Sequence, residues 1–318
     1  MQWRIRGNAL GALERSGTGR PSVPDIRAAR RRLLIIHNTI AGMRRRWLLR
    51  HVCRELQAAG TELTLVSADS LEMDSRLAQD AVASGAYDAV VAAGGDSTVR
   101  GVGTGLCGSC VPLGIIPIGT GNVLAEEIRF RGRPQTVARH LLYGPSVPVY
   151  GGRANGAYFF AMAGAGFDAR VLARLDTRWK RRLGKLAYAW PMIVELARTP
   201  AVFEAVIDGE NHSCSWLVIA KVSRYAGPFR LTRRQTIETT GFHAVIIDAR
   251  SRASLLGVVV AIALGRAEFH RDVRIIPCRR VLIPRQPGVP LQLDGEPFGE
   301  TPLEVEPAAL PVHIIFPH

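Results

Sequence analysis

The chain has 318 residues, of which 47% are hydrophobic and 21% are charged. This length and composition leave room for two globular domains and exclude a disordered chain. The formal net charge of +14 favours anionic partners, namely nucleic acid, anionic lipid headgroups or nucleotide phosphates. Aromatic residues make up only 7% of the chain and do not interleave with the basic clusters, so we expect no nucleic-acid partner.

Residues 1–30 are rich in Arg, Gly and Pro and contain no apolar core like that of a secretory signal. We interpret them as a basic flexible tail, although their Arg content would also suit a transit peptide. The longest apolar run, residues 255–264, is shorter than the about 20 residues that span a bilayer. The odd number of cysteines, five, and the lack of a secretory signal indicate a reducing cytoplasm.

Residues 31–145 alternate between short apolar runs, typical of buried strands, and segments with apolar residues at helical spacing. The expected strands are residues 33–37, 62–66, 88–93 and 113–118. The expected helices are residues 47–58, 77–82, 99–106 and 123–128. Strands that alternate with helices form parallel βαβ units with right-handed crossovers, so we expect an α/β domain here.

Residues 146–300 have a different pattern, in which short β-like runs are separated by Gly, Pro and Asp turns. The runs are residues 157–161, 202–207, 215–220, 243–247, 273–277 and 280–283. They predict an antiparallel β domain, interrupted by a basic helical stretch at 177–197 and by the apolar run at 255–264. Residues 301–318 alternate like a closing strand, which is a candidate to return to the first domain.

The strongest local motif, at residues 93–98, joins the end of an expected strand to the start of a helix. Gly94 and Gly95 would let backbone N–H groups approach phosphate oxygens, and the helix N-terminus adds a positive dipole. The carboxylate of Asp96 would repel phosphate, so we expect it to act on Mg²⁺ that bridges phosphate oxygens. The alternative is a simple strand-to-helix turn with Asp96 as the N-cap.

Two further strand ends carry polar and glycine residues. The loop at 117–122 includes Gly119, Thr120 and Asn122, and the first strand is followed by residues 38–42. Because the carboxyl ends of parallel strands meet at one edge of a sheet, a nucleotide that crosses this edge would contact all three loops. The chain contains no GxxxxGK[ST] loop, and no GxGxxG follows the first strand, which argues against P-loop and dinucleotide sites.

A third motif lies near the end of the β domain, where Asp294 and Glu296 flank Gly295. The functional interpretation is a general base that accepts the proton of an attacking hydroxyl group. The alternative is a solvated β-turn, which Asp-Gly often forms.

These three elements, in this order, resemble the diacylglycerol kinase catalytic-domain family, which includes bacterial lipid kinases and the sphingosine and ceramide kinases. The resemblance runs from about residue 32 to residue 318. Its motifs fall at residues 38–42, 94–98, 117–122, 164–169, 184–188, 224–229 and 294–296. A turn that often holds a structural Mg²⁺ in this family has no acidic residue here, at 239–241, and Lys221 replaces a frequent Asn.

The resemblance implies a three-layer α/β domain like that of NAD kinases over residues 31–145 and an antiparallel β-sandwich over 146–300, with the active site between them. It implies an ATP-dependent lipid kinase in which Asp96 acts through Mg²⁺, and Asp294 or Glu296 activates the hydroxyl of a diacylglycerol-like or sphingoid/ceramide-like lipid. The implied nucleotide-binding residues are Asn38, Thr39, Ile40, Ala41, Gly42, Ser70, Gly94, Gly95, Asp96, Ser97, Thr98, Val99, Arg100, Gly119, Thr120 and Asn122.

A lipid kinase meets its substrate at a membrane, so we expect peripheral contact with the anionic inner face of the membrane. The stretch at 178–182, Arg-Trp-Lys-Arg-Arg, is a candidate for this contact, with an exposed basic helix as the alternative. A homodimer is a further expectation, because edge strands of β domains can pair between chains.

Two other functions stay open at this point. Ser97 stands at a glycine position of the family loop, and Gly101 stands where a Glu is usual, so one alternative is a degenerate member that binds nucleotide or lipid without catalysis. The other is an enzyme like NAD kinase, which shares the Gly-Gly-Asp loop but not the β-domain motifs.

Overall fold

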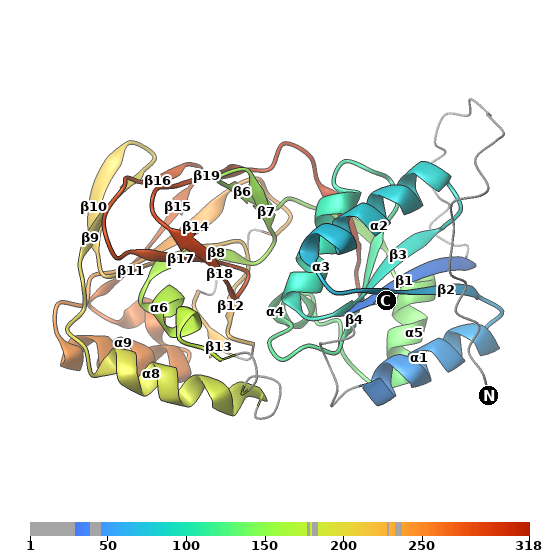
Figure 1. Cartoon of the computed structure of the whole chain (residues 1–318), viewed down its shortest axis with the longest axis horizontal. Coiled ribbons are helices and arrows are strands. Elements are labelled where there is room, and N and C mark those ends of the chain that lie inside the picture. The colour runs from blue at the N-terminus through green and yellow to red at the C-terminus, as the bar shows by residue number, and fades with distance from the viewer. Residues whose placement is uncertain (1–28, 39–45, 177–178, 180–183, 228, 233–236) are drawn as a thin grey trace.

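The computed structural model describes residues 29–38, 46–176, 179, 184–227, 229–232 and 237–318. Figure 1 shows two parts side by side, an α/β part formed mostly by the first half of the chain and a part rich in strands formed mostly by the second half.

A six-stranded sheet forms the centre of the α/β part, in the order β2-β1-β3-β4-β20-β5. The strands are β1 (Arg32–Asn38), β2 (Glu62–Ala68), β3 (Ala89–Gly94), β4 (Leu113–Pro117), β5 (Ser146–Val149) and β20 (Val312–Ile315). The four strands expected from the sequence are present and parallel, and β20 is parallel to β4. Only β5 runs antiparallel to its neighbour, β20. The buried runs of β3 and β4 fit strands covered on both faces.

Helices cover both faces of this sheet, so the expected three-layer arrangement is confirmed (Figure 1). On one face, α1 (Arg46–Ala58) packs on α5 (Pro134–Tyr143), and α1 turns Leu48, Val52 and Leu56 to the core. On the other face, α2 (Leu71–Ser84) packs on α3 (Asp96–Leu106). The short α4 (Val123–Glu127) follows β4 at the end of the sheet that faces the β-rich part.

The β-rich part is an antiparallel sandwich of two six-stranded sheets, ordered β10-β9-β16-β19-β6-β7 and β15-β14-β11-β8-β17-β18. The first sheet contains β6 (Gly152–Ala154), β7 (Ala157–Phe159), β9 (Phe203–Ile207), β10 (Glu210–Cys214), β16 (Val281–Ile283) and β19 (Leu303–Pro307). The second contains β8 (Met162–Gly166), β11 (Trp216–Ala220), β14 (Phe242–Ile247), β15 (Val273–Cys278), β17 (Pro290–Leu293) and β18 (Glu296–Glu300). A second apolar core, which includes Phe159, Phe203 and Leu217, lies between the sheets. The predicted sandwich is confirmed, with each expected β run forming a strand.

Shorter elements surround the sandwich. They are α6 (Phe167–Ala173), η2 (Gly184–Tyr188), α8 (Ala189–Leu196), β12 (Arg224–Tyr225), β13 (Phe229–Arg230), α9 (Arg252–Ala263) and η3 (Ala267–Phe269). The apolar run at 255–264 is therefore helical, in α9, and the described part of the basic stretch at 177–197 is η2 and α8. Most of the stretch at 178–182 lies outside the described residues. In the part of the chain that is described, no helix is long and apolar enough to cross a membrane.

Residues 301–318 form two strands where the alternation predicts one. β19 lies in the sandwich, whereas β20 lies between β4 and β5 in the α/β sheet. Pro307 and Pro311 bracket the break, and proline cannot donate a ladder hydrogen bond. β5 also joins the α/β sheet, so this sheet extends to residue 149 and is completed by residues 312–315.

Candidate active site

The carboxyl ends of four neighbouring strands lie along one edge of the α/β sheet. The register pairs Asn38 with Ala68, His37 with Ala93, and Gly94 with Pro117. The loops that follow β1, β3 and β4 therefore start side by side, as the sequence predicts. Asn38 is the last residue of β1, while Thr39, Ile40, Ala41 and Gly42 lie outside the described residues.

The loops after β3 and β4 touch backbone to backbone. The carbonyl oxygen of Gly94 accepts hydrogen bonds from the N–H groups of Ile118 and Gly119, at 3.2 and 3.0 Å. A Cβ at Gly119 would lie 2.3 Å from Cα of Gly95, so only glycine permits this approach. Gly95 is the N-cap of α3 and has no side chain to accept the first N–H groups of the helix. These groups point out of the helix end, where an anion can bind.

Three predicted nucleotide residues have buried polar atoms without a hydrogen-bond partner among the described residues. The atoms are Oγ1 of Thr98, Nε of Arg100 and Oδ1 of Asn122. Asn122 is held in the left-handed region at φ 50°, and its Nδ2 donates to the carbonyl oxygen of Gly119 at 3.0 Å. Buried polar atoms are nearly always paired in folded proteins, so these three atoms are available for a polar ligand.

Asp96 is the first residue of α3, and its carboxylate faces the start of α4. Its Oδ1 accepts a hydrogen bond from the N–H of Leu124 at 3.3 Å. The alternative of Asp96 as N-cap of α3 is wrong, because Gly95 has that position. Burial, together with the charge of Asp294, raises the pKa of Asp96 to about 7, against the opposing effect of N–H groups at residues 122–124. Asp96 and Asp294 come from different parts of the molecule, yet the charge of Asp294 acts on Asp96.

The two unusual residues of this motif, Ser97 and Gly101, lie within α3. Ser97 is half-buried and is not among the described residues with positive φ, so its side chain strains no backbone there. Gly101 faces α2, and a Cβ on it would lie 2.6 Å from Cβ of Asp74. The close approach of the two helices explains the glycine at this position. Val99, next to Ser97 and Thr98, is buried in the core.

Two predicted nucleotide residues lie beside these loops. Ser70 follows β2 and is the N-cap of α2, where its Oγ accepts a hydrogen bond from the N–H of Met73 at 3.2 Å. Its hydroxyl proton stays available for another acceptor. Thr120 is half-buried in the loop between β4 and α4.

The acidic motif forms the two-residue turn of the β17–β18 hairpin. Asp294 and Gly295 both have positive φ, 48° and 80°, which the I′ hairpin turn requires. The β-turn alternative is therefore confirmed as a description of the backbone. The side chain of Asp294 is not solvated, however, because the residue is only 8% exposed.

The Asp294 carboxylate is fixed by three backbone N–H groups. Its Oδ1 accepts from Ala161 and Met162 at 2.8 and 2.9 Å, and its Oδ2 accepts from Phe160 at 3.0 Å. Oδ2 therefore has one protein donor and retains capacity for another. Burial raises the pKa of Asp294, although the positive charge of Arg100 and these N–H groups oppose the rise.

Arg100 connects the glycine loop, residues 93–98, with the acidic turn at Asp294 and Gly295. Its Nη1 donates to the carbonyl oxygen of Leu293 at 3.2 Å, and its charge acts on Asp294. Glu296 is half-buried at the start of β18, opposite Leu293. The structure therefore brings Asp96, Arg100 and Asp294 together.

Sequence reasoning missed a second link between the two parts. Glu127, the last residue of α4, accepts hydrogen bonds from the N–H groups of Ser223 and Arg224 at 3.1 and 3.0 Å, and from the Ser223 hydroxyl. These partners are 96 and 97 positions away, so no local pattern could indicate them.

Comparison with known proteins gives the same family as the sequence motifs. Residues 32–154 match the diacylglycerol kinase catalytic domain, and residues 161–314 match the YegS C-terminal NAD kinase beta sandwich-like domain. A diacylglycerol kinase of Mycobacterium tuberculosis is 31% identical over 245 residues, which are 73% of this chain and 78% of that protein. The chain belongs to the diacylglycerol kinase family.

Other family members match over most of this chain. A diacylglycerol kinase of Bacillus subtilis is 29% identical over 301 residues, 90% of this chain and 97% of that protein. The chain also spans about half, 52%, of an uncharacterized Synechocystis protein, at 29% identity. The crystal structure of a diacylglycerol kinase from Bacillus anthracis has the same fold, with a TM-score of 0.71, 19% identity, and coverage of 90% of this chain and 97% of that one.

In this diacylglycerol kinase family member, the side chain of Lys221 reaches the turn at residues 239–241, which lacks the acidic residue of the family's structural Mg²⁺ site. Lys221 is fully buried, and its Nζ donates to the carbonyl oxygens of Thr239 and Gly241, the latter at 2.9 Å. It also lies 5.4 Å from the ring centroid of Phe242. Burial lowers the pKa of Lys221 to about 8. A side-chain cation thus binds the carbonyl oxygens of this turn.

Proposed function

We propose that this family member is an ATP-dependent lipid kinase that transfers the γ-phosphoryl group to the hydroxyl of a diacylglycerol-like or sphingoid-like lipid. The observation that carries the proposal is the hydrogen bond from Arg100, on the helix after the glycine loop, to the carbonyl oxygen of Leu293, which precedes Asp294 in the sandwich, while the charge of Asp294 also acts on Asp96. Phosphoryl transfer needs a phosphate cradle and a group that positions the nucleophile at the same place. The names of the relatives support a lipid acceptor.

The chain's own residues would bind the triphosphate at the strand ends. The N–H groups of the first turn of α3 are the donors for phosphate oxygens. The unpartnered Thr98 Oγ1 and Arg100 Nε are further donors. Asn38, Ser70 and Thr120 lie at the adjoining strand ends, where they would contact the rest of the nucleotide.

The residues present also fit Mg²⁺. Among the described residues there is no group of three or more His, Cys, Asp or Glu side chains that could hold a metal ion. Nucleotide-bound Mg²⁺ does not need such a group, because phosphate oxygens and water supply most of its ligands. Asp96 would hold it, because two interacting carboxylates with raised pKa values are stabilised by a cation. When bound, the ion neutralises negative charge on the phosphate oxygens.

Asp294 is the better candidate for the proton acceptor. Its carboxylate is fixed by three N–H groups, and Oδ2 has room for a substrate hydroxyl. A carboxylate whose pKa is raised by burial is a stronger base than an exposed one. Arg100 would keep it ionised near neutral pH, because a positive charge favours the anion.

The degenerate alternative keeps its two supports, the side chain at Ser97 and the absence of the usual Glu at position 101. Ser97 lies in a helical turn without positive φ, and the contact with α2 accounts for Gly101. A measurement of phosphate transfer decides between this alternative and an active kinase.

Transfer of labelled phosphate from ATP to a lipid in detergent micelles tests the proposal. Wild-type protein with Mg²⁺ should label a lipid, whereas Asp96→Asn and Asp294→Asn should each lose about 100-fold or more of the rate. The matched control is Asp80→Asn, an exposed carboxylate on α2. Offering NAD as the acceptor separates an NAD kinase-like enzyme, which would label NAD and no lipid.

We place the enzyme in the cytoplasm, at the inner face of the membrane, where ATP and lipid substrates meet.

The degenerate alternative predicts a different outcome of the labelling experiment. If circular dichroism shows that the protein is folded, and it labels neither lipid nor NAD, the result would support this alternative.

A further inference from the structure

Helix α9 has apolar side chains on its exposed side as well as on its buried side. Leu255, Val258 and Ile262 face the core, whereas Leu256, Val260 and Leu264 are 50%, 48% and 67% exposed. The exposed three are four residues apart, so they form a single stripe along the helix and just beyond its end. A helix that is apolar on all sides is normally buried on all sides.

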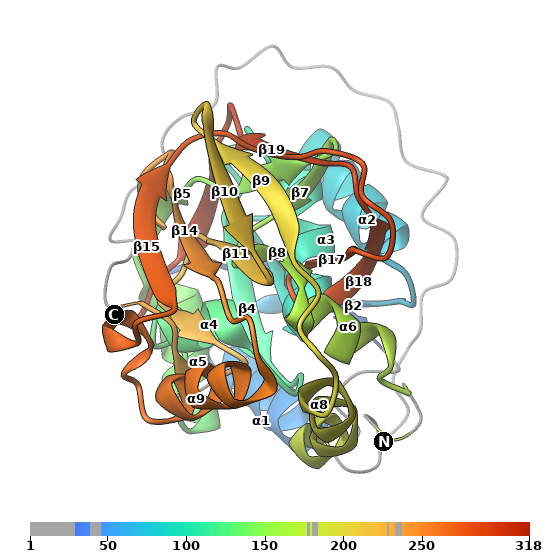
Figure 2. The same ribbon diagram turned by 90° about the vertical axis from the view of Figure 1, so that its left-hand side faces the viewer.

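The elements next to α9 also expose apolar side chains. η2 and α8 expose Leu186, Trp190 and Ile193, at 73%, 73% and 58%. Figures 1 and 2 both show α8 and α9 next to one another at the lower edge of the molecule. We call the six side chains Leu186, Trp190, Ile193, Leu256, Val260 and Leu264 the α8–α9 face. Exposed apolar patches of this kind mark interaction sites in folded proteins.

Arginines flank the α8–α9 face, while Asp272, which accepts a hydrogen bond from Ser254, and Glu268 of η3 are acidic groups beside α9. Arg252 begins α9, Arg266 follows its end, and Arg198, which follows α8, has a side chain that is 59% exposed. α9 contains no acidic residue, and Glu195, the only one in α8, is 3% exposed and paired with Arg174. An arginine at the start of a helix opposes the helix dipole, so helix stability does not explain Arg252.

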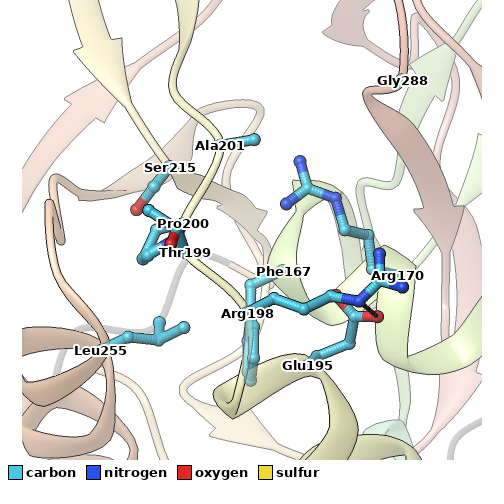
Figure 3. A pocket seen from close by; sticks show the side chains of 10 residues that line it. All are labelled: Phe167, Arg170, Glu195, Arg198, Thr199, Pro200, Ala201, Ser215, Leu255 and Gly288. Carbon is cyan, nitrogen blue, oxygen red and sulfur yellow. Dashed lines mark ion pairs between the residues drawn. The ribbon is translucent and has the colours of Figure 1, made fainter.

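A cavity that is lined by Arg170, Arg198 and Glu195 lies near these arginines. It has a volume of about 310 Å³ and lies between α6, the end of α8 and the start of α9 (Figure 3). Arg170 and Arg198 line it, and Nη2 of Arg170 is buried without a hydrogen-bond partner in the described part of the chain. None of the predicted catalytic or nucleotide residues lines this cavity.

We propose that the α8–α9 face docks onto an anionic lipid bilayer. Trp and aliphatic side chains would enter the headgroup and acyl boundary, and the arginines would bind lipid phosphates. A second copy of the chain is the less suitable occupant, because two such faces would bring arginines of like charge together. The purpose of this docking, which is to bring the lipid to the site, rests on the proposed function. The test of the docking does not depend on that function.

The position of the face suits this purpose. α8 packs on α6, and α6 packs on β17 and β18, the strands that hold Asp294. The short helix α6 would therefore lie between a bilayer bound at α8 and α9 and the acidic turn.

Flotation with vesicles of phosphatidylglycerol and phosphatidylcholine tests the proposal without ATP. Wild-type protein should bind these vesicles, and the double variant Trp190→Ser/Leu264→Ser should reduce the partition coefficient by about tenfold or more. Arg252→Ser/Arg266→Ser should reduce it by roughly tenfold at low salt and less at high salt. The control Leu65→Ser/Leu282→Ser removes two exposed apolar side chains, 46% and 42% exposed against 73% for Trp190 and 67% for Leu264, from other elements and should change binding less than about twofold.

Equal loss in the control, or unchanged binding of Trp190→Ser/Leu264→Ser, would overturn the proposal. A wild-type dimer in sedimentation that the double variant makes monomeric, without vesicle binding by either, would assign the face to a second copy instead. If the kinase function holds, the double variant should keep its rate on a short-chain diacylglycerol dissolved as monomers and lose it on vesicles. If the kinase function fails, the flotation result still decides the docking.

Discussion

Nη1 of Arg100 donates a hydrogen bond to the carbonyl oxygen of Leu293, 3.2 Å away, and so joins the helix after the glycine loop to the strand before Asp294. This contact crosses from the α/β part to the sandwich. It places a positive charge beside a buried carboxylate whose other partners are backbone N–H groups. The charge of Arg100 is therefore expected to set how readily Asp294 accepts a proton.

Arg100→Met should lower kcat/KM for lipid phosphorylation by about tenfold to 100-fold, because the Asp294 anion loses its nearest positive charge. The acidic limb of the pH profile should move to higher pH, since removal of a cation raises the pKa of Asp294 further. Arg100→Lys should restore part of the rate. Arg76→Met, on the exposed side of α2, is the control. A normal pH profile in Arg100→Met would refute this role.

The pH profile of the wild type should reflect Asp96. Its pKa is raised to about 7, so the carboxylate becomes protonated as the pH falls through neutrality. If the ionised form holds Mg²⁺, kcat/KM should fall below pH 7, and a higher Mg²⁺ concentration should move the midpoint to lower pH. Initial rates at several Mg²⁺ concentrations measure this shift. A midpoint that does not depend on Mg²⁺ would argue against Asp96 as the metal ligand.

Ser97→Gly should change kcat/KM less than about threefold, because Ser97 lies in an ordinary helical turn and glycine gains nothing there. Chemical denaturation should show a loss of about 1 kcal/mol or less in the free energy of unfolding. An increase in activity of tenfold would mean instead that the serine side chain obstructs phosphate.

Gly101→Glu should destabilise the protein by more than about 2 kcal/mol, although it restores the residue usual in the family. A Cβ at this position would lie 2.6 Å from Cβ of Asp74, whose carboxyl group is buried and has its pKa raised to about 7. The new carboxylate would add like charge to a buried one. The control is Gly85→Glu, and both variants are compared by thermal unfolding. A Cβ at Gly85 would have no atom within 4 Å, but φ at Gly85 is +60°, so the comparison separates the cost of crowding from the cost of losing a glycine.

Lys221 should make the protein more stable as the pH rises from 8 to 10. Below pH 8 the lysine is protonated in the folded and in the unfolded protein, so the cost of burying its charge is fully present there. Above pH 8 the folded state releases the proton first, and the cost falls until the unfolded chain also deprotonates near its ordinary pKa of 10.5. Lys221→Met should therefore show a smaller gain than the wild type, by about 2 kcal/mol between pH 7.5 and 9.5. Equal gains would mean that the ammonium is well solvated.

Much of this fold could be predicted from the sequence, because periodicity marks buried strands and helices directly. β1, β3 and β4 and their glycine loops are local features, and parallel strands bring their ends to one edge whatever the rest of the chain does. The position of Asp294 was indicated by the family resemblance more than by its own pattern, since Asp-Gly forms an ordinary hairpin turn as well.

The remaining features depend on partners far along the chain. Glu127 binds residues almost 100 positions away, and Lys221 is a surface residue by composition until the fold buries it between two carbonyl oxygens. The break between β19 and β20 was missed because alternation continues across Pro307 and Pro311. The helix expected at 99–106 begins earlier than its apolar spacing indicates, because α3 starts at Asp96 and already includes Ser97.

The place of β20 has a consequence for how the protein is made. It pairs with β4 and β5 inside the first sheet, so the α/β part lacks an interior strand until residues 312–315 have left the ribosome. Until then β4 presents an open, apolar edge in the nascent chain. Unlike a string of domains that fold one after another during synthesis, this chain has to complete its two halves together.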